Sequence, residues 1–365
     1  MSAVSFFPSR QITLYMMKLF VVRTLAVLLM LVLILQTLDL LGESGKILGV
    51  PGNDNGDLWR YIGMRVPQLI QRFLPFSVLL GTLITFTTLS QNSEVVAMKA
   101  AGLSAHQILA PMIVASLFIA IISFIFNETV VAPSTAKLKK WQDVEYATVP
   151  KDDGIRNNVW VREGRDFIQA HTVIGTGNAM QLKDVRVYQR ANGSVIRVIR
   201  AEQARFVDSA WRLENVRTFD VAAAAQTRTD ALVVGRGIEP KRFEQTKVDG
   251  DSLGFVALSR AIDELKAAGR RTDALEGNLW HKISGPLSAV LMPLLGAVAA
   301  FGLARSGALF LRAVIGMALG FAYFVADNFA LAMGNLGAYP PFIAAWAPFL
   351  LFLLIGETVL VRTEE

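Results

Sequence analysis

The side chains that could perform catalysis are few and far apart in this 365-residue chain. It contains no cysteine, so a thiolate nucleophile, a disulfide and a Cys-ligated metal are excluded. Its three histidines, His106, His171 and His281, lie in three different regions without the spacing of metal ligands. No serine occupies a Gly-x-Ser-x-Gly turn, and none has a histidine placed to favour a triad. We therefore expect no catalytic residues, no metal and no cofactor, and a transport or binding function that comes from surfaces.

Residues 41–46, Leu-Gly-Glu-Ser-Gly-Lys, are similar to part of a phosphate-binding loop. That motif needs a glycine five residues before Gly45, where Leu40 stands, and a serine or threonine after Lys46, where Ile47 stands. These two departures exclude ATP binding by this motif.

The composition indicates a membrane protein with a water-exposed part. Hydrophobic residues make up 53% of the chain and charged residues 18%, and the mean hydropathy is +0.43. The net charge of +6 comes from Lys and Arg residues at the ends of apolar runs and scattered through the middle. No basic run is interleaved with aromatic residues, so membrane topology and anionic lipid explain the charge, and we expect no nucleic-acid partner.

Residues 1–133 contain three apolar runs that predict transmembrane helices. The first covers about residues 20–41, the second is uncharged over 73–93, and the third over 100–127 apart from His106. We expect a polar loop at residues 42–65. Lys18 and Arg23 precede the first run and Asp39 lies near its end, so the positive-inside rule predicts a cytoplasmic N-terminus.

Residues 134–277 have a different composition, with charges every few residues and no run long enough to span a bilayer. Asn192-Gly193 lies between two alternating segments, which is a strong hairpin signal. We expect short strands at 159–161, 167–170, 184–189, 194–199, 204–207 and 211–219, and a helix at 259–268. The spacing predicts an extracytoplasmic β domain of the sandwich or jelly-roll kind.

Residues 278–365 contain three further apolar runs, at 283–304, 313–336 and 341–361, the second interrupted by Asp327. Arg305 and Arg312 flank the connection between the first two, whereas residues 334–339 carry no charge. This asymmetry predicts a cytoplasmic C-terminus. The predicted fold is therefore a membrane α-helical protein of six transmembrane helices with an inserted extracytoplasmic β-jelly-roll-like domain.

A short helix is predicted at residues 92–103, between the second and third spans. Gly102 can adopt the left-handed conformation that ends a helix, and Ser104 with Gln107 forms a capping box that begins the next one. The helix is too short to cross a bilayer. Its apolar residues fit docking into a groove of a soluble partner, and a tight connector on the membrane surface is the alternative.

The order of these elements resembles one family over essentially the whole chain. Residues 91–107, which include Ser-Glu-Val-Val-Ala-Met-Lys-Ala-Ala-Gly-Leu-Ser, resemble the coupling segment of the lipopolysaccharide-export permeases LptF and LptG. The stretches at 278–283, 286–288 and 323–327 also resemble this family. Residues 159–164 and 278–283 are more similar to LptG than to LptF.

The resemblance implies a permease subunit of an ABC-type exporter that moves lipopolysaccharide from the inner membrane toward a periplasmic bridge. It implies an LptF-type permease, an LptB-type ATPase dimer that hydrolyses the ATP, and LptC-type and LptA-type bridge proteins as partners. The β domain would then be periplasmic. The residues that would contact the ATPase are Glu94, Val95, Met98 and Ala101.

The resemblance also implies lipid contacts on the first and fifth spans and at the outer membrane edge. Acyl chains would lie against Leu28, Leu31 and Leu35. Relatives carry lysines toward the outer end of the first span, where this chain has Gln36, Gly42 and Glu43. The phosphates of the lipid would then meet Lys46, Lys137, Lys139 and Lys140, or these lysines would only extend to the membrane interface.

Asp327 is a possible polar site within the membrane, where a carboxyl group needs a partner or a water-filled cavity. A hydrogen bond to a neighbouring span and a role in gating both fit.

Two rival functions differ from lipid export. A mechanotransmitting membrane protein of the FtsX or MacB kind usually has four spans, against the six expected here, and a membrane-anchored scaffold or sensor would have no ATPase partner.

Overall fold

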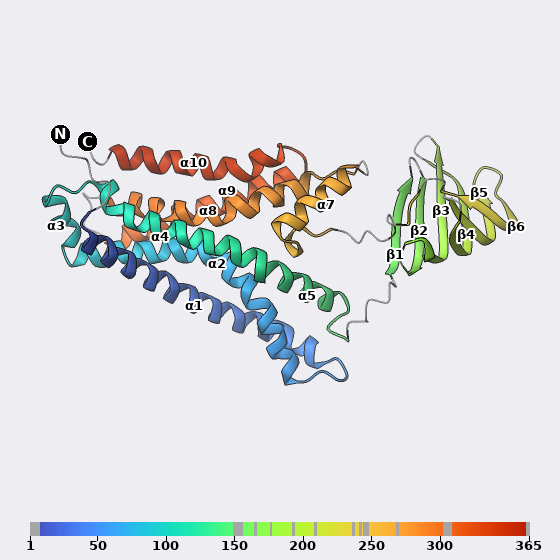
Figure 1. Ribbon diagram of the computed structural model, residues 1–365, viewed down its shortest axis with the longest axis horizontal. Helices are drawn as coiled ribbons and strands as arrows, with labels where there is room; N and C mark the ends of the chain where they lie inside the picture. Colours follow the sequence, from blue (N-terminus) through green and yellow to red (C-terminus); the bar gives the residue numbers. More distant parts are fainter. Residues whose placement is uncertain are drawn as a thin grey trace. The chain divides into compact units, whose positions relative to one another are not determined.

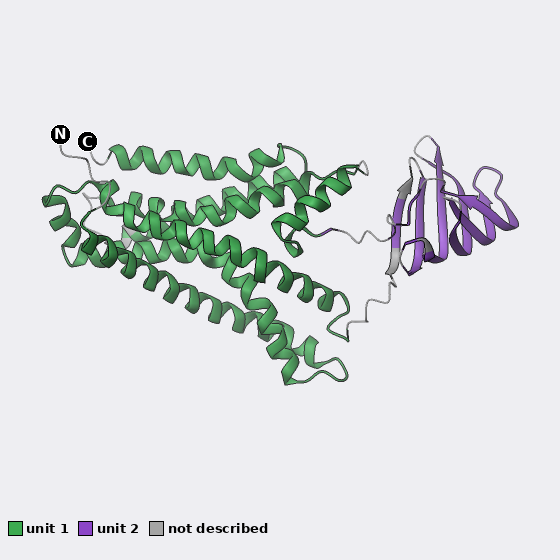
Figure 2. Ribbon diagram, viewed as in Figure 1, with its two compact units in different colours: residues 1–148, 249–365 green, residues 149–248 purple. Residues whose placement is uncertain are grey.

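The computed structural model describes residues 8–148, 156–163, 166–175, 177–191, 194–207, 210–235, 238–240, 243, 248–267, 270–301 and 309–362. The chain divides into two compact units, one of residues 1–148 with 249–365 and one of residues 149–248 (Figure 2). The first is helical and the second contains the sheet. Residues 134–148 and 249–277, which the sequence analysis assigned to the β domain, group with the helices.

Among the residues that the structure describes, six helices are long and apolar enough to cross a membrane, which confirms the predicted fold of a membrane domain with an inserted β domain (Figure 1). They are α1 (Arg10–Leu48), α2 (Asn55–Gln91), α4 with its continuation α5 (Ala105–Phe126 and Ala132–Asp143), α8 (Asp273–Phe301), α9 (Leu309–Asn335) and α10 (Pro341–Arg362). Shorter helices accompany them, among them α3 (Glu94–Ala100) and α7 (Phe255–Ala267).

The expected polar loop at residues 42–65 is wrong. Helix α1 continues to Leu48, and α2 begins at Asn55 behind a capping box made by Asp54 and Asp57. The last turns of α1 stay helical because Ile47 is fully buried beside Tyr61 and Trp141, and because Lys46 pairs with Glu43 three residues earlier at 2.9 Å. The resemblance of residues 41–46 to a phosphate loop therefore falls on a helix.

The core of the helical unit lies where α2 and α8 meet their neighbours. Small residues allow the helices to pack closely there. A Cβ at Gly316 of α9 would lie 2.6 Å from Leu83, and a Cβ at Gly320 would lie 2.1 Å from Leu79. A Cβ at Gly81 of α2 would lie 2.9 Å from the backbone Cα of Thr24 in α1. A turn of π-helix, Asn127–Val131, joins α4 to α5, whose first turn contains Pro133.

The β unit contains one six-stranded antiparallel sheet with its strands in consecutive order, β1 to β6 (Figure 1). The strands are β1 (Arg156–Glu163), β2 (Asp166–Ile174), β3 (Gln181–Ala191), β4 (Ser194–Val207), β5 (Ala210–Asp220) and β6 (Ala225–Val234). The predicted strands 194–199 and 204–207 are one strand, β4, and β6 was not predicted. Ala191 pairs with Ser194 on either side of the predicted Asn-Gly turn, which itself lies outside the described residues.

Candidate functional site

The short helix α3 is present where the sequence predicts it. Ser93 precedes it in the left-handed conformation, with φ of 59°, and Gly102 follows it with φ of 86°. The predicted capping box begins α4, because the Ser104 hydroxyl accepts from the Gln107 amide at 3.2 Å and the Gln107 side chain accepts from the Ser104 amide at 3.0 Å. These two boundaries hold α3 to seven residues.

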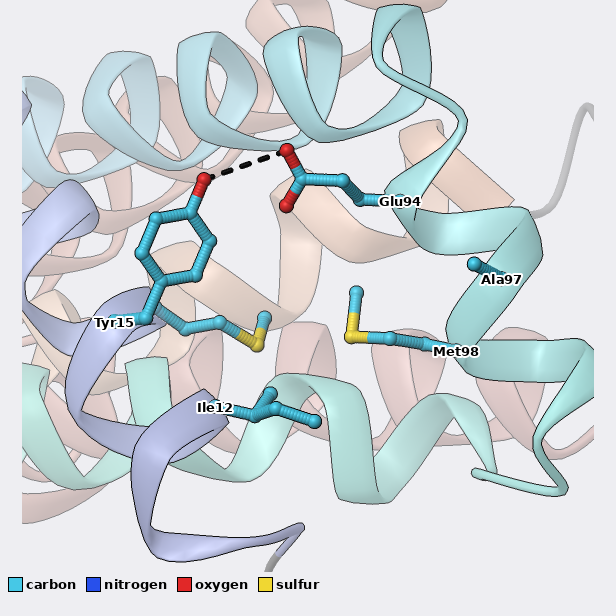
Figure 3. Close-up of a pocket in the computed structure, with 6 residues that line it drawn as sticks. Ile12, Tyr15, Glu94, Ala97 and Met98 are labelled. Carbon is cyan, nitrogen blue, oxygen red and sulfur yellow. Dashed lines mark hydrogen bonds between the residues drawn. The ribbon is translucent and has the colours of Figure 1, made fainter.

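A small apolar pocket of about 210 Å³ lies between α3 and the first turns of α1 (Figure 3). Its lining residues are Ile12, Tyr15, Met16, Glu94, Ala97 and Met98. Figure 3 shows Tyr15 and Glu94 pointing toward each other across one side of it, and the Tyr15 hydroxyl donates to Glu94 Oε1 at 3.4 Å. Asn92 Nδ2 also donates to this oxygen, at 3.1 Å. The pocket therefore combines adaptable apolar surface with one carboxylate, a chemistry that suits an apolar side chain next to a cation.

The predicted ATPase contacts do not all lie on one exposed face of α3. Val95 is only 8% exposed and packs into the helical core, and Met98 is partly buried against it. Val96, which the sequence analysis passed over, is 67% exposed, and Ala101 is exposed as well. The outward surface of α3 is therefore made by Val96, with Ala97, Ala100 and Ala101, and Glu94 lies at its edge.

Helix α3 also contacts the end of α8. Lys99 Nζ lies 4.9 Å from the centre of the Phe301 ring, and Phe301 packs edge-to-face on Phe86 of α2. Because the Tyr15 and Lys99 contacts involve different helices, α3 is held by both α1 and α8. Sequence alone could not pair these residues, since the partners are 79 and more than 200 positions apart.

The leucines predicted to face lipid acyl chains turn partly inward. Leu28 is 8% exposed and packs with Val32 against Leu69 and Leu74 of α2, and Leu35 is partly buried in the same cluster. Leu31 is partly exposed. The outward apolar face of α1 is instead made by Val22, Leu25, Leu29, Met30, Leu33, Ile34, Leu38 and Leu41, each more than half exposed.

Two of the four predicted phosphate-contacting lysines are engaged in ion pairs. Lys46 pairs with Glu43, and Lys139 pairs with Asp249 at the start of the segment that returns from the β unit. Burial raises the pKa of Asp249, but hydrogen bonds from Lys139 and Ser252 outweigh it and hold that pKa below its usual value. Lys137 and Lys140 are exposed, and the described part of the chain offers neither of them an ion pair.

Tyr146 fixes the segment that leads from α5 into the β unit. Its hydroxyl donates to Glu43 Oε2 of α1 at 2.8 Å, and its carbonyl accepts from Trp141 and from Asn53, both at 2.9 Å. Burial raises the pKa of Tyr146 above 10, and the hydrogen bond to Glu43 adds to the shift. Sequence reasoning missed this residue, whose only local signal is a tyrosine just beyond a predicted membrane edge.

Asp327 of α9 finds its partner on α8. It is 7% exposed, and its Oδ2 lies 3.0 Å from Nε2 of His281. The sequence analysis named both residues without connecting them, since 46 positions separate them. Within the described residues, no three of His, Asp and Glu gather in a way that could hold a metal ion.

Comparison with known proteins adds the family. A family model described as lipopolysaccharide export system permease LptF/LptG matches residues 14–362. The lipopolysaccharide export system permease protein LptG of Escherichia coli K12 is 26% identical over 308 residues, which are 83% of this chain and 84% of that relative. LptG of Haemophilus influenzae is 25% identical over 324 residues, 86% and 89% of the two chains. Since the matched range includes both the helical unit and the β unit, the chain belongs to the LptF/LptG family of permeases of the lipopolysaccharide export system.

Proposed function

We propose that this chain is the LptG-type permease subunit of an ABC-type exporter that extracts lipopolysaccharide from the inner membrane and passes it to a periplasmic bridge. Its six membrane-length helices and its family make it an inner-membrane protein. The two relatives described above, from Escherichia coli and Haemophilus influenzae, are both LptG, which supports the choice of LptG. The alternative is the LptF paralogue, since the family model covers both.

The observation that carries the mechanism is the surface of α3. An exposed Val96 beside three exposed alanines forms a small apolar surface, with the pocket and the Glu94 carboxylate at one edge and the exposed Lys99 on the same helix. Such a surface suits a groove of a soluble partner that offers apolar and basic groups. We infer that this partner is an LptB-type ATPase dimer, that it hydrolyses the ATP, and that Glu94, Val96, Met98 and Ala101 receive its movement. Val95 is buried and packs α3 against the helical core.

The proposed orientation is supported by the elements that share one end of the helical unit. The start of α1 contacts α3 through Tyr15, and the start of α4 contacts the end of α10 through His106 and Glu357, 3.3 Å apart (Figure 1). An ATPase partner is cytoplasmic, so both termini are cytoplasmic and the β unit, whose connectors leave from the far end of α4–α5, is periplasmic. Arg10, Lys18 and Arg23 at the α3 end support this orientation.

The lipid route follows from the outward faces of the spans. The exposed apolar face of α1 suits acyl chains, and the exposed Lys137 and Lys140 suit phosphates at the outer membrane edge. Lys46 and Lys139 would have to exchange a carboxylate for a phosphate. An LptF-type permease completes the cavity, and LptC-type and LptA-type proteins continue the bridge from the β unit.

The test is copurification of the ATPase with the full chain from cells that express the complex. We expect Val96→Asp and Glu94→Lys to lose the ATPase while the permease remains in the membrane, because both residues lie at the surface of α3. Lys183→Glu, an exposed charge reversal on β3, is the control and retains the ATPase. An ATPase that stays bound to both α3 variants would overturn the assignment.

A further inference from the structure

Four arginines lie directly opposite one another across four neighbouring strands of the β unit. The register pairs Arg186 of β3 with Arg200 of β4, Arg200 with Arg217 of β5, and Arg217 with Arg228 of β6. Residues directly opposite in antiparallel strands share a face of the sheet. We call these four residues the arginine row; it runs across strands β3 to β6, which Figure 1 labels.

The arginine row lies on the outward face of the sheet. The residues before and after Arg186 and Arg200 are buried, namely Val185, Val187, Ile199 and Ala201. Arg200, Arg217 and Arg228 are exposed, and the Arg186 side chain is 35% exposed. Because successive residues of a strand point to opposite faces, the core occupies one face and the arginines the other.

The charges of the row are only partly compensated. Neighbouring strands are about 4.8 Å apart, and like charges directly opposite each other destabilise a sheet. Asp184 pairs with Arg186 at 3.7 Å. Glu202, two positions from Arg200 on β4, instead accepts a hydrogen bond from Asn215 at 3.0 Å. Among the described residues, none forms an ion pair with Arg200, Arg217 or Arg228. Three guanidinium groups of the row thus keep donors available to an anion, and the stability lost by placing like charges side by side is a cost that a binding function would explain.

An apolar row lies beside the arginines, one step along the same strands. Tyr188, Val198 and Phe219 are paired directly opposite one another, and each lies two positions from an arginine of the row. Trp160 stacks on Tyr188 with ring centres 5.7 Å apart and is 52% exposed, and Phe219 is 43% exposed. The face therefore places a partly exposed aromatic and aliphatic row beside a cationic one.

We propose that this face binds a multiply phosphorylated amphiphile, with phosphates on the arginine row and acyl chain on the apolar row. The row spans about 14 Å, three strand spacings, so a single phosphate would engage only neighbouring arginines and two separated phosphates would use the whole row. The occupant is the exported lipid itself. The inference rests on the proposed function and assigns this chain a lipid site outside the membrane helices.

The experiment uses the full chain in nanodiscs of phosphatidylcholine, with a photoreactive phenylalanine analogue at position 219 and purified lipopolysaccharide as the probe. We expect an adduct whose yield falls about 25-fold in Arg200→Gln with Arg217→Gln, since each arginine near an anionic surface contributes about fivefold. Arg205→Gln with Arg212→Gln is the matched control. These two arginines are also exposed and directly opposite on β4 and β5, and the yield stays within twofold. Dephosphorylated lipopolysaccharide is expected to give the same low yield as the double variant.

Three results would overturn the proposal: no adduct at position 219, equal loss in the control, or full competition by phosphatidylglycerol vesicles, which would make the face a general surface for anionic bilayers. A second photoreactive position, Leu29 on the outward face of α1, distinguishes failure of the site on the sheet from failure of the proposed function. An adduct at Leu29 with none at 219 refutes only the site on the sheet. No adduct at either position counts against lipid export by this chain.

Discussion

Gly81→Ala is expected to force α1 away from α2, because the two helices touch at their backbones there. A Cβ at Gly81 would lie 2.9 Å from Thr24 Cα, 3.0 Å from Thr24 N and 2.3 Å from Thr24 Oγ1. The hydroxyl can rotate away, but the backbone atoms cannot. An ordinary carbon contact is about 3.5 Å, so α1 must move by about 0.6 Å along a seam that is packed over several turns.

The size of the effect follows from comparison with a second glycine of the same helix. Overpacking of this kind costs about 1–3 kcal/mol, and the change from Gly to Ala in a helix returns about 1 kcal/mol. Gly63→Ala is the matched control, because a Cβ at Gly63 would meet nothing within 4 Å. The propensity gain is common to both variants, so Gly81→Ala should be less stable than Gly63→Ala by about 1–3 kcal/mol.

The assay is unfolding of the purified chain in mixed micelles titrated with SDS, followed by tryptophan fluorescence. Thr24→Ala in the Gly81→Ala background should rescue only a small part of the loss, since the contacts at 2.9 and 3.0 Å are to backbone atoms. Equal unfolding free energies for the two glycine variants would refute the close approach of α1 and α2 at this position.

Three further polar contacts give predictions in the same unfolding assay. Asp327→Ala leaves His281 without its partner and should lower the unfolding free energy by about 1–2 kcal/mol. Asp327→Asn should lower it less, and equal unfolding free energies for the two variants would contradict the pairing. Tyr146→Phe should cost about 1 kcal/mol through the lost bond to Glu43. Because the pKa of Tyr146 is raised in the folded chain, its contribution to the unfolding free energy is complete below pH 10 and is lost as the pH rises through the folded-state pKa. Tyr146→Phe should remove this loss of stability at alkaline pH. The lowered pKa of Asp249 acts oppositely, with its contribution to the unfolding free energy present above pH 3.8 and lost as the pH falls. Asp249→Asn should lack this acid loss, and a variant that loses as much stability as the parent on acidification would contradict the prediction.

The sequence predicts the number and order of membrane helices because length and apolar content decide them, and it predicts the boundaries of α3 because Gly102 and Ser104 act locally. It does not predict which side of α1 faces outward. The run around Leu28 and Leu35 is apolar on all sides, so no periodicity distinguishes the surface that packs on α2 from the surface left exposed. Val95 and Val96 pose the same problem on α3, where only tertiary packing decides which valine is buried.

The partners of charged residues could not be predicted for a related reason. Lys139 has the position expected of a headgroup contact, but its carboxylate partner, Asp249, lies 110 positions later, beyond the whole β unit. The arginine row is likewise hidden in the sequence. Its members are separated by 11 to 17 positions and come together only because each antiparallel strand is paired in one particular register.

Helix α1 joins the two ends of the helical unit that the proposed mechanism uses. Tyr15 contacts α3 at one end, and Glu43, 28 residues later, holds Tyr146 in the lead-in to the β unit, so the two contacts are about 42 Å apart. The contacts are unequal, because the Tyr15 bond is exposed and 3.4 Å long, whereas the Tyr146 bond is part-buried and 2.8 Å long. A pull on α3 would therefore tilt α1 about its Glu43 end. A tilt of about 5° would move the Tyr15 end by about 4 Å and leave the lead-in nearly in place. Under the proposed mechanism, the α1 seam would open at the α3 end while the contact between Glu43 and Tyr146 is kept.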